Sequence, residues 1–277
     1  MSNKIFECMD DDFLYYNYTS INSFNEIVNS KKIWLSDCRF LNDKKELSIA
    51  IEKFVSNFND EEKKILSYVL DLCNFDKYFC IFSMSKSPKV LSQWRGYGDD
   101  GKGICIGFRK KFLELFFSSE KTAYDTFLIH CIYENFDDHI QKIIEDNKKN
   151  IDSIVELYRN SRAINEFSEK IRGKYELFSN IYRELLRIKN PSFKEEQEIR
   201  IVRIAPLPLI KTRVCNGLII PYTEIDLSDD KTRDGLQYIM KELWLGPKCD
   251  KRNREAIRSY GLFGWGLFLN EYDCGYI

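Results

Sequence analysis

Histidine is scarce in this chain, and paired metal-binding cysteines are missing. The 277 residues include two histidines, His130 and His139, and nine cysteines, none of which form a C-x-x-C pair. A Ser-His-Asp or Cys-His catalytic unit would have to use one of these two histidines. His130 lies inside an apolar run and His139 at a polar helix start, so we do not expect hydrolase chemistry of those types. Without paired ligand spacing, we also expect no metal site.

A charge excess and long apolar runs are missing as well. The chain has 42 basic and 43 acidic residues, a formal net charge of −1. A strongly basic face for duplex DNA is therefore not indicated, and nucleic acid is not the expected partner, although a local patch stays open. No apolar run is long enough to span a bilayer, and the acidic start MSNKIFECMDDD lacks a signal core. We expect a cytoplasmic protein with no membrane partner and with reduced, mostly buried cysteines.

The composition that is present is typical of a soluble globular protein. Hydrophobic residues make up 44% of the chain and charged residues 31%. The segments FLYYNYTS, KIWLS, KYFCIFSMS, GICIGF, EIRIVRIA and GLIIPYTEIDL read as strands, with helices between several of them. This order predicts an α+β fold, with a mostly antiparallel twisted sheet core and flanking helices, in a single domain over 1–277.

Residues 137–190 differ in character from the rest of the chain. They are charged and rich in lysine, and their apolar residues recur at intervals of three and four. This spacing predicts amphipathic helices. We expect a helical insertion within the domain, ended by Pro191.

The stretch GYGDDGKG, residues 96–103, matches G-x-G-x-x-G. In a dinucleotide-binding fold these glycines follow a strand and open a helix. Here the preceding KVLSQWRGY has helical spacing and the following GICIGF alternates like a strand, while Asp99 and Asp100 place two negative charges in the loop. We therefore interpret the loop as a turn from a helix into a strand.

Several motifs in order resemble a bacterial family known as domain of unknown function 2971. They are YNYTS, KIWLS, FLNDKKE, CIFS, WRGYGDDGKGICIGF, EEQEIRIV and LWLGP. The layout of that family is similar to the ADP-ribosyltransferase fold, which implies NAD as co-substrate and no metal. Likeness of fold does not establish function.

The resemblance implies a catalytic carboxylate at the start of EEQEIRIV. Breaking the nicotinamide–ribose bond develops an oxocarbenium-like centre, which a nearby carboxylate stabilises. Glu198 is the candidate, with Glu196 two positions before it on the same strand face. The alternative is a charged strand start in which Glu198 pairs with Arg95, Arg200 or Lys194.

Two other segments carry candidate NAD-binding residues. On the first strand, Asn17 stands where many members of these groups carry His, and it can donate and accept hydrogen bonds. Its neighbour Tyr18 either lines the pocket or packs in the core. Ser83 ends a later strand.

The helix before the glycine loop supplies a candidate wall for the pocket. Trp94 and Tyr97 stand three positions apart on one helical face and could stack a nicotinamide or adenine. Core packing is the alternative for Trp94. Arg95 could bind a diphosphate or pair with an aspartate of the loop.

Two functions from different classes follow from this reading. The first is transfer of ADP-ribose from NAD to an unknown macromolecular acceptor, or NAD hydrolysis, which would suit a bacterial defence or stress effector. The second is a non-catalytic binding or sensor module, whose helical insertion docks a partner protein through an apolar helix face. The loss of the first-strand His favours the second. A nuclease or nucleic-acid binder is the weakest reading.

Overall fold

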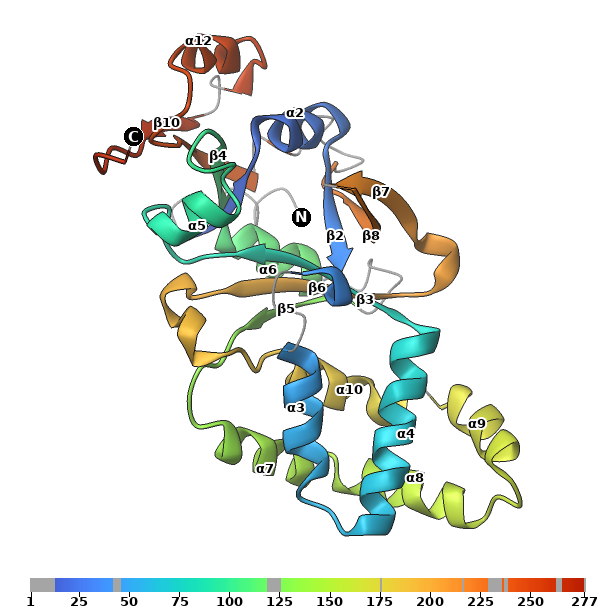
Figure 1. Ribbon diagram of the computed structural model, residues 1–277. Coiled ribbons are helices and arrows are strands. Elements are labelled where there is room, and N and C mark those ends of the chain that lie inside the picture. The colour runs from blue at the N-terminus through green and yellow to red at the C-terminus, as the bar shows by residue number, and fades with distance from the viewer. Residues whose placement is uncertain are drawn as a thin grey trace.

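Two β-sheets and a lobe of helices make up the protein (Figure 1). The computed structural model describes residues 13–41, 46–118, 126–174, 176–215, 217–228, 236, 239–262 and 266–276. All but one of the strand pairings within the sheets are antiparallel among these residues, and the exception is the pairing of β9 with β10. The mixed helix and strand content and the antiparallel pairing confirm the predicted α+β class.

The first sheet has the strand order β1-β4-β9-β10, and the second has the order β5-β6-β3-β2-β8-β7. The first sheet contains β1 (Leu14–Thr19), β4 (Ile104–Arg109), β9 (Met240–Leu245) and β10 (Phe268–Glu271). The second contains β2 (Lys32–Asp37), β3 (Tyr78–Met84), β5 (Thr126–His130), β6 (Ile199–Ala205), β7 (Lys211–Cys215) and β8 (Leu218–Asp226). The sequence predicted one sheet and missed β7.

The two sheets meet where β1 approaches the end of β3. The backbone of Tyr16 exchanges two hydrogen bonds with Ser85, at N···O distances of 2.8 and 2.7 Å. Apolar residues from both sheets and from α2 (Ile21–Ser30) form a shared core, which includes Phe24, Ile106 and Ile201. This contact fixes the first strand beside the second sheet.

The strand β6 is buried along its whole length because both of its faces are covered. Successive residues of a strand point to opposite faces. Ile199 and Ile201 accordingly lie in the core shared by the sheets, whereas Val202 and Ile204 lie in a second core beneath the helices. The second sheet therefore joins the two parts of the molecule.

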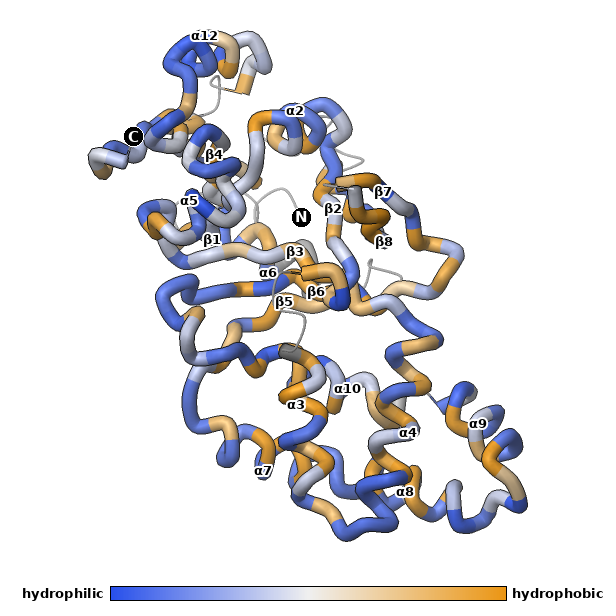
Figure 2. The backbone as a smooth tube through the Cα atoms, in the orientation of Figure 1, coloured by the Kyte–Doolittle hydropathy of each residue, from blue (hydrophilic) through white to orange (hydrophobic). Residues whose placement is uncertain are grey.

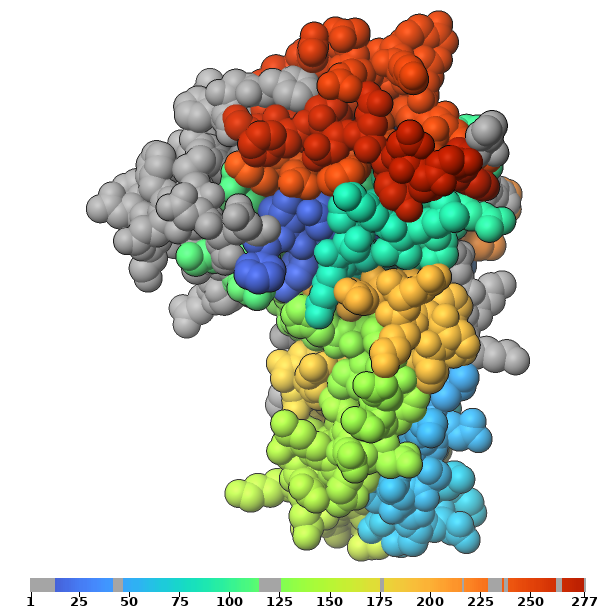
Figure 3. Space-filling model, turned by 90° about the vertical axis from the view of Figure 1, so that its left-hand side faces the viewer, coloured from blue at the N-terminus to red at the C-terminus, as the bar shows by residue number. Residues whose placement is uncertain are grey.

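The helical lobe covers one part of the second sheet (Figure 1). Its helices are α3 (Glu46–Val55), α4 (Asp60–Asp76), α7 (Phe136–Asp146), α8 (Lys148–Arg159), α9 (Ile164–Arg172) and α10 (Glu176–Leu185). Hydrophobic and hydrophilic stretches alternate along these helices (Figure 2), and the space-filling view shows segments α3–α4 and α7–α8 side by side (Figure 3).

The apolar faces of the predicted insertion are largely used within the lobe. Phe167 and Ile154 are fully buried, as is Tyr182, which stacks on Phe79 of β3 with ring centroids 4.3 Å apart. The helices of 137–190 thus pack on α3, α4 and the sheet. This arrangement weakens the case for a free docking face on the insertion.

The remaining short elements connect these parts. They are η2 (Cys38–Phe40), α5 (Leu91–Gly96), α6 (Lys110–Ser118), η3 (Pro191–Glu196), η4 (Leu207–Leu209) and α12 (Arg252–Arg258). In the part of the chain that the structure describes, no helix is both long and apolar enough to cross a membrane. All eight cysteines in that part are free thiols; Cys8 lies outside it.

The glycine-rich loop connects α5 to β4, the order that the sequence indicated. Its backbone N–H groups bond within the loop: Gly101 donates to Trp94 and Gly98 at 3.0 Å, and Gly103 donates to Gly98 at 2.8 Å. Asp100 accepts hydrogen bonds from Tyr276 and from a lysine. A phosphate-binding loop needs free N–H groups, so this loop serves as a turn.

Candidate functional site

A cavity of about 390 Å³ lies on the same face of the second sheet as the helical lobe. Residues paired across adjacent strands share a face. Ser36 pairs with Ile81, and Ile81 pairs with Val202, which faces the lobe core. Both Ser36 and Ile81 line the cavity. Its volume is within the range of small-ligand sites.

Most of the residues that the sequence singled out line this one cavity. They come from β1, the end of β3, the turn after α5 and the segment before β6, which are far apart in the chain. The six residues are Asn17, Tyr18, Ser83, Tyr97, Glu196 and Glu198.

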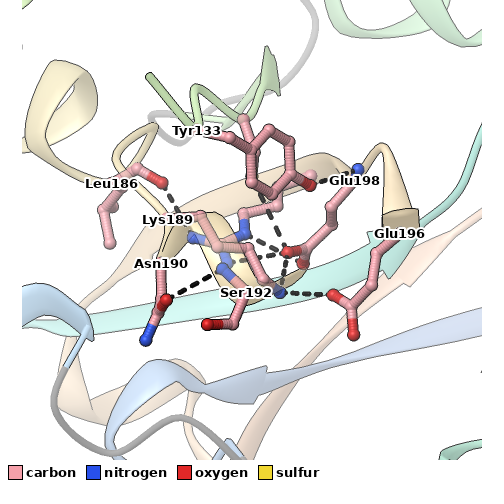
Figure 4. Close-up of polar contacts among 9 residues, drawn as sticks. Tyr133, Leu186, Lys189, Asn190, Ser192, Glu196 and Glu198 are labelled. Carbon is pink, nitrogen blue, oxygen red and sulfur yellow. Dashed lines mark hydrogen bonds and ion pairs between the residues drawn. The ribbon is translucent and has the colours of Figure 1, made fainter. Parts of the chain in front are cut away.

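The floor of the cavity holds a buried group of four charges, which we call the carboxylate cluster: Lys189, Glu196, Glu198 and Arg200. Figure 4 shows the contacts of Lys189 with Glu196 and Glu198. The Lys189 Nζ lies 2.6 Å from the Glu196 Oε2 and 2.5 Å from the Glu198 Oε2. Arg200 binds Glu198 in a fork, from Nε to Oε1 at 2.9 Å and from Nη2 to Oε2 at 2.8 Å. Two negative and two positive charges therefore balance inside the protein.

Contacts outside the carboxylate cluster fix Arg200 and Glu198. Arg200 also donates from Nη1 to the carbonyl oxygen of Leu186, just after α10, at 2.8 Å. The backbone N–H of Glu198 donates to the hydroxyl of Tyr133 at 2.7 Å. Because its backbone N–H and its carboxylate are both hydrogen-bonded, Glu198 has a defined position.

The backbone, rather than strand alternation, brings the two glutamates together. Glu196 ends the 3₁₀ helix η3, and Gln197 has a left-handed conformation with φ 44°. Glu198 then precedes the first residue of β6. The sequence expected both glutamates on one strand face; they do meet at Lys189, but through this turn.

The cluster shifts the pKa values of its carboxyl groups in opposite directions. Burial alone would raise the pKa of Glu198, but Arg200 and Lys189 lower it to about 2. Burial raises the pKa of Glu196 above its ordinary value, although Lys189 opposes this. Burial would lower the pKa of Lys189, but the two glutamates raise it. Glu198 is thus ionised, and Glu196 is the more basic carboxylate.

Asn17 contributes an unsatisfied acceptor to the cavity. Its Nδ2 donates to the backbone oxygen of Ser83 at 2.9 Å, which fixes the orientation of the amide. The buried Oδ1 has no hydrogen-bond partner. Because a buried polar atom without a partner is costly, this oxygen is suited to accept a hydrogen bond from a ligand hydroxyl or amide.

Two residues of the expected wall lie elsewhere. Trp94 is fully buried, packs edge-on against Tyr18 and donates from Nε1 to the Pro88 oxygen at 2.9 Å. Arg95 points away from the cavity lining and stacks over Tyr276, with its Cζ 5.7 Å from the ring centroid. Tyr97 alone of the three lines the cavity.

Lys189 and Arg213 are charged cavity residues that the sequence did not single out. Lys189 follows an amphipathic helix and looks there like any other surface lysine; its buried position depends on contacts with distant glutamates. Arg213 lies on β7, a strand that the sequence did not predict. Neither position has a local signal. In the described ranges, no group of three or more His, Cys, Asp or Glu is arranged to hold a metal.

A family model described as "Protein of unknown function (DUF2971)" matches residues 93–201. The match runs from α5 to β6 and includes Tyr97, Glu196 and Glu198. Over this stretch the chain is similar to the family that its motifs indicate, whereas YNYTS, KIWLS, FLNDKKE, CIFS and LWLGP lie outside the match. No curated protein and no solved structure gives a match.

Proposed function

We propose that the cavity binds NAD and cleaves its nicotinamide–ribose bond, passing ADP-ribose to a macromolecular acceptor or to water. The observation that supports this most is the convergence of Glu198, Glu196 and the orphan Asn17 oxygen in one cavity. These residues come from the segments that the ADP-ribosyltransferase layout would use. The cavity thus has a buried anion for the ribose and an unsatisfied acceptor elsewhere in its lining.

The proposed reaction needs a negative charge near the ribose. When the C1′–N bond breaks, its electron pair stays on the nicotinamide nitrogen, and positive charge develops on the ribosyl carbon. Glu198, bound to a ribose hydroxyl, would stabilise that charge. The attacking nucleophile loses a proton as it bonds to C1′, and Glu196 is the nearby base.

Arg200 and Lys189 serve as positioning residues in this proposal. They keep Glu198 ionised, because the low pKa of its carboxyl results from their charges. They also occupy its two oxygens unequally: Oε1 accepts from Arg200, while Oε2 accepts from both cations and from the Cys131 thiol. Oε1 therefore has more room for a ribose hydroxyl.

Nicotinamide release from NAD by the purified protein tests the proposal. We expect release by the wild type and a fall of about 10²- to 10³-fold in Glu198→Gln, which keeps the shape and removes the charge. Glu134→Gln is the matched control, because Glu134 pairs with Lys194 on the surface, outside the cavity. It should release nicotinamide at the wild-type rate.

One further variant and one further experiment complete this test. Glu198→Asp keeps the charge but withdraws the carboxylate, so it should lose activity even if Glu198→Gln fails to fold. A cell lysate with labelled NAD supplies acceptors that a pure transferase lacks. No release and no labelling by a folded wild type would overturn the proposal and return the non-catalytic binding module to first place.

A further inference from the structure

Arg213 is a cavity residue without a carboxylate partner among the described residues. It lies on β7 and reaches across β8 to β2, where its Nη2 donates to the Ser36 Oγ at 2.8 Å. Its Cζ stands 5.7 Å from the centroid of the Trp34 ring. Its buried Nε has no hydrogen-bond partner. The Ser36 hydroxyl and the Trp34 ring thus hold the guanidinium in place, and one of its donors is unused. An arginine in this state is suited to bind an anion.

The other cations of the cavity are already paired. Lys189 and Arg200 bind the two glutamates, as described above. Lys32 lies 3.2 Å from Glu224. Arg213 is therefore the cation whose charge a ligand in the cavity can use most fully.

The register shows why Arg213 and the carboxylate cluster face the same space. Ser36 of β2 pairs with Ile81 of β3, and Ser83, two residues further along β3, pairs with Arg200 of β6. All four side chains share one face of the sheet, because residues two apart on a strand point the same way. One end of the cavity thus holds Glu198 and another holds Arg213.

We propose that Arg213, with Ser36 and Trp34, is a phosphate subsite that binds the diphosphate of the ligand in this cavity. This inference rests on the proposed function, in which a ribose meets Glu198; in NAD the diphosphate continues from that ribose. The free edge of the guanidinium would donate to two phosphate oxygens, as arginine does in bidentate pairs. The subsite would select a ribose that carries phosphate over a free nucleoside.

Calorimetric titration of the protein with four probes tests the subsite: ADP-ribose, AMP, inorganic pyrophosphate and nicotinamide riboside. We expect Arg213→Met to weaken ADP-ribose binding at least tenfold, with nicotinamide riboside unchanged. Lys211→Met is the matched control. Lys211 lies two residues earlier on β7, pairs with Glu224 and does not line the cavity, so its loss should leave all four affinities unchanged.

The results of these titrations distinguish a nucleotide diphosphate from free phosphate as the ligand. They also distinguish failure of the subsite from failure of the proposed function. Arg213-dependent binding of ADP-ribose but not of pyrophosphate would support a nucleotide diphosphate; equal dependence for both would support a general phosphate site. Either result without nicotinamide release would keep the subsite and remove the proposed function. Unchanged ADP-ribose affinity in a folded Arg213→Met, or no binding of any phosphate probe by the wild type, would overturn the subsite.

Discussion

At the scale of single residues, the site depends on how a buried glutamate is kept charged. Glu198 is 5% exposed, and an isolated ionised carboxylate would not be stable there. The fork of Arg200 and the ammonium of Lys189 compensate for the lost hydration. Removing one partner of such a group leaves a buried charge unpaired, which typically costs about 3–5 kcal/mol.

The free energy of unfolding should therefore depend on pH between the folded and unfolded pKa values of Glu198. The Glu198 pKa is about 2 in the folded protein, against 4.5 for the unperturbed group. Between these values the unfolded chain binds more protons, so this group adds stability above about pH 4.5 and loses it as pH falls toward 2. The full contribution is about 3 kcal/mol.

Denaturant unfolding of the wild type and Glu198→Gln from pH 3 to 6 measures this contribution. The difference in unfolding free energy should widen as pH rises. Glu196 acts in the opposite sense, because burial and the charge of Glu198 raise the pKa of its carboxyl. Loss of the Glu198 charge relieves part of that rise and offsets part of the widening. A difference that does not change with pH would show that Glu198 is not ionised through these contacts.

At the scale of elements, the glycine loop positions β4 and β1 rather than a ligand. A Cβ atom on Gly103 would lie 2.1 Å from the Thr19 carbonyl oxygen, at the end of β1, and 2.8 Å from the Gly98 oxygen. Backbone atoms cannot yield as a flexible side chain can. The close approach of the loop to β1 explains a glycine at this position.

Gly103→Ala should consequently destabilise the protein by about 2 kcal/mol or more, through strain at a backbone contact. Gly96→Ala is the control within the same loop motif, since no atom lies within 4 Å of its added Cβ. Gly96 is the last residue of α5, and alanine is a better helix former than glycine. The Gly96→Ala variant should therefore be as stable as the wild type or slightly more stable. Thermal unfolding of both variants checks the contrast; equal midpoints would contradict it.

At the scale of the whole molecule, the two-sided sheet accounts for what the sequence could and could not predict. Alternation in EIRIVRIA and helical spacing in 137–190 are local patterns, so the strands and helices could be predicted. The glutamates were found because they lie beside a motif. The division into two sheets, strand β7 and the partners of Lys189 depend on pairing between distant segments, which no local pattern encodes.

The same reasoning explains the outcome for α5. The helical spacing in KVLSQWRGY correctly indicated a helix, which ends at Gly96, but it could not tell which neighbour would bury the indole of Trp94. The structure packs Trp94 against Tyr18 and Tyr272, behind the cavity rather than along it. A helical face predicts burial, whereas the identity of the packing partner comes from the tertiary fold.

In the proposed function, NAD binds in the cavity with its nicotinamide ribose at Glu198. A crystal structure with carba-NAD, an analogue whose nicotinamide bond cannot be cleaved, tests this most directly. We predict density in the cavity, with a sugar hydroxyl hydrogen-bonded to the Glu198 carboxylate, a ligand donor on the Asn17 Oδ1 and the diphosphate at Arg213. An empty cavity at a saturating concentration of the analogue, or the analogue bound elsewhere, would show that NAD does not bind at Glu198.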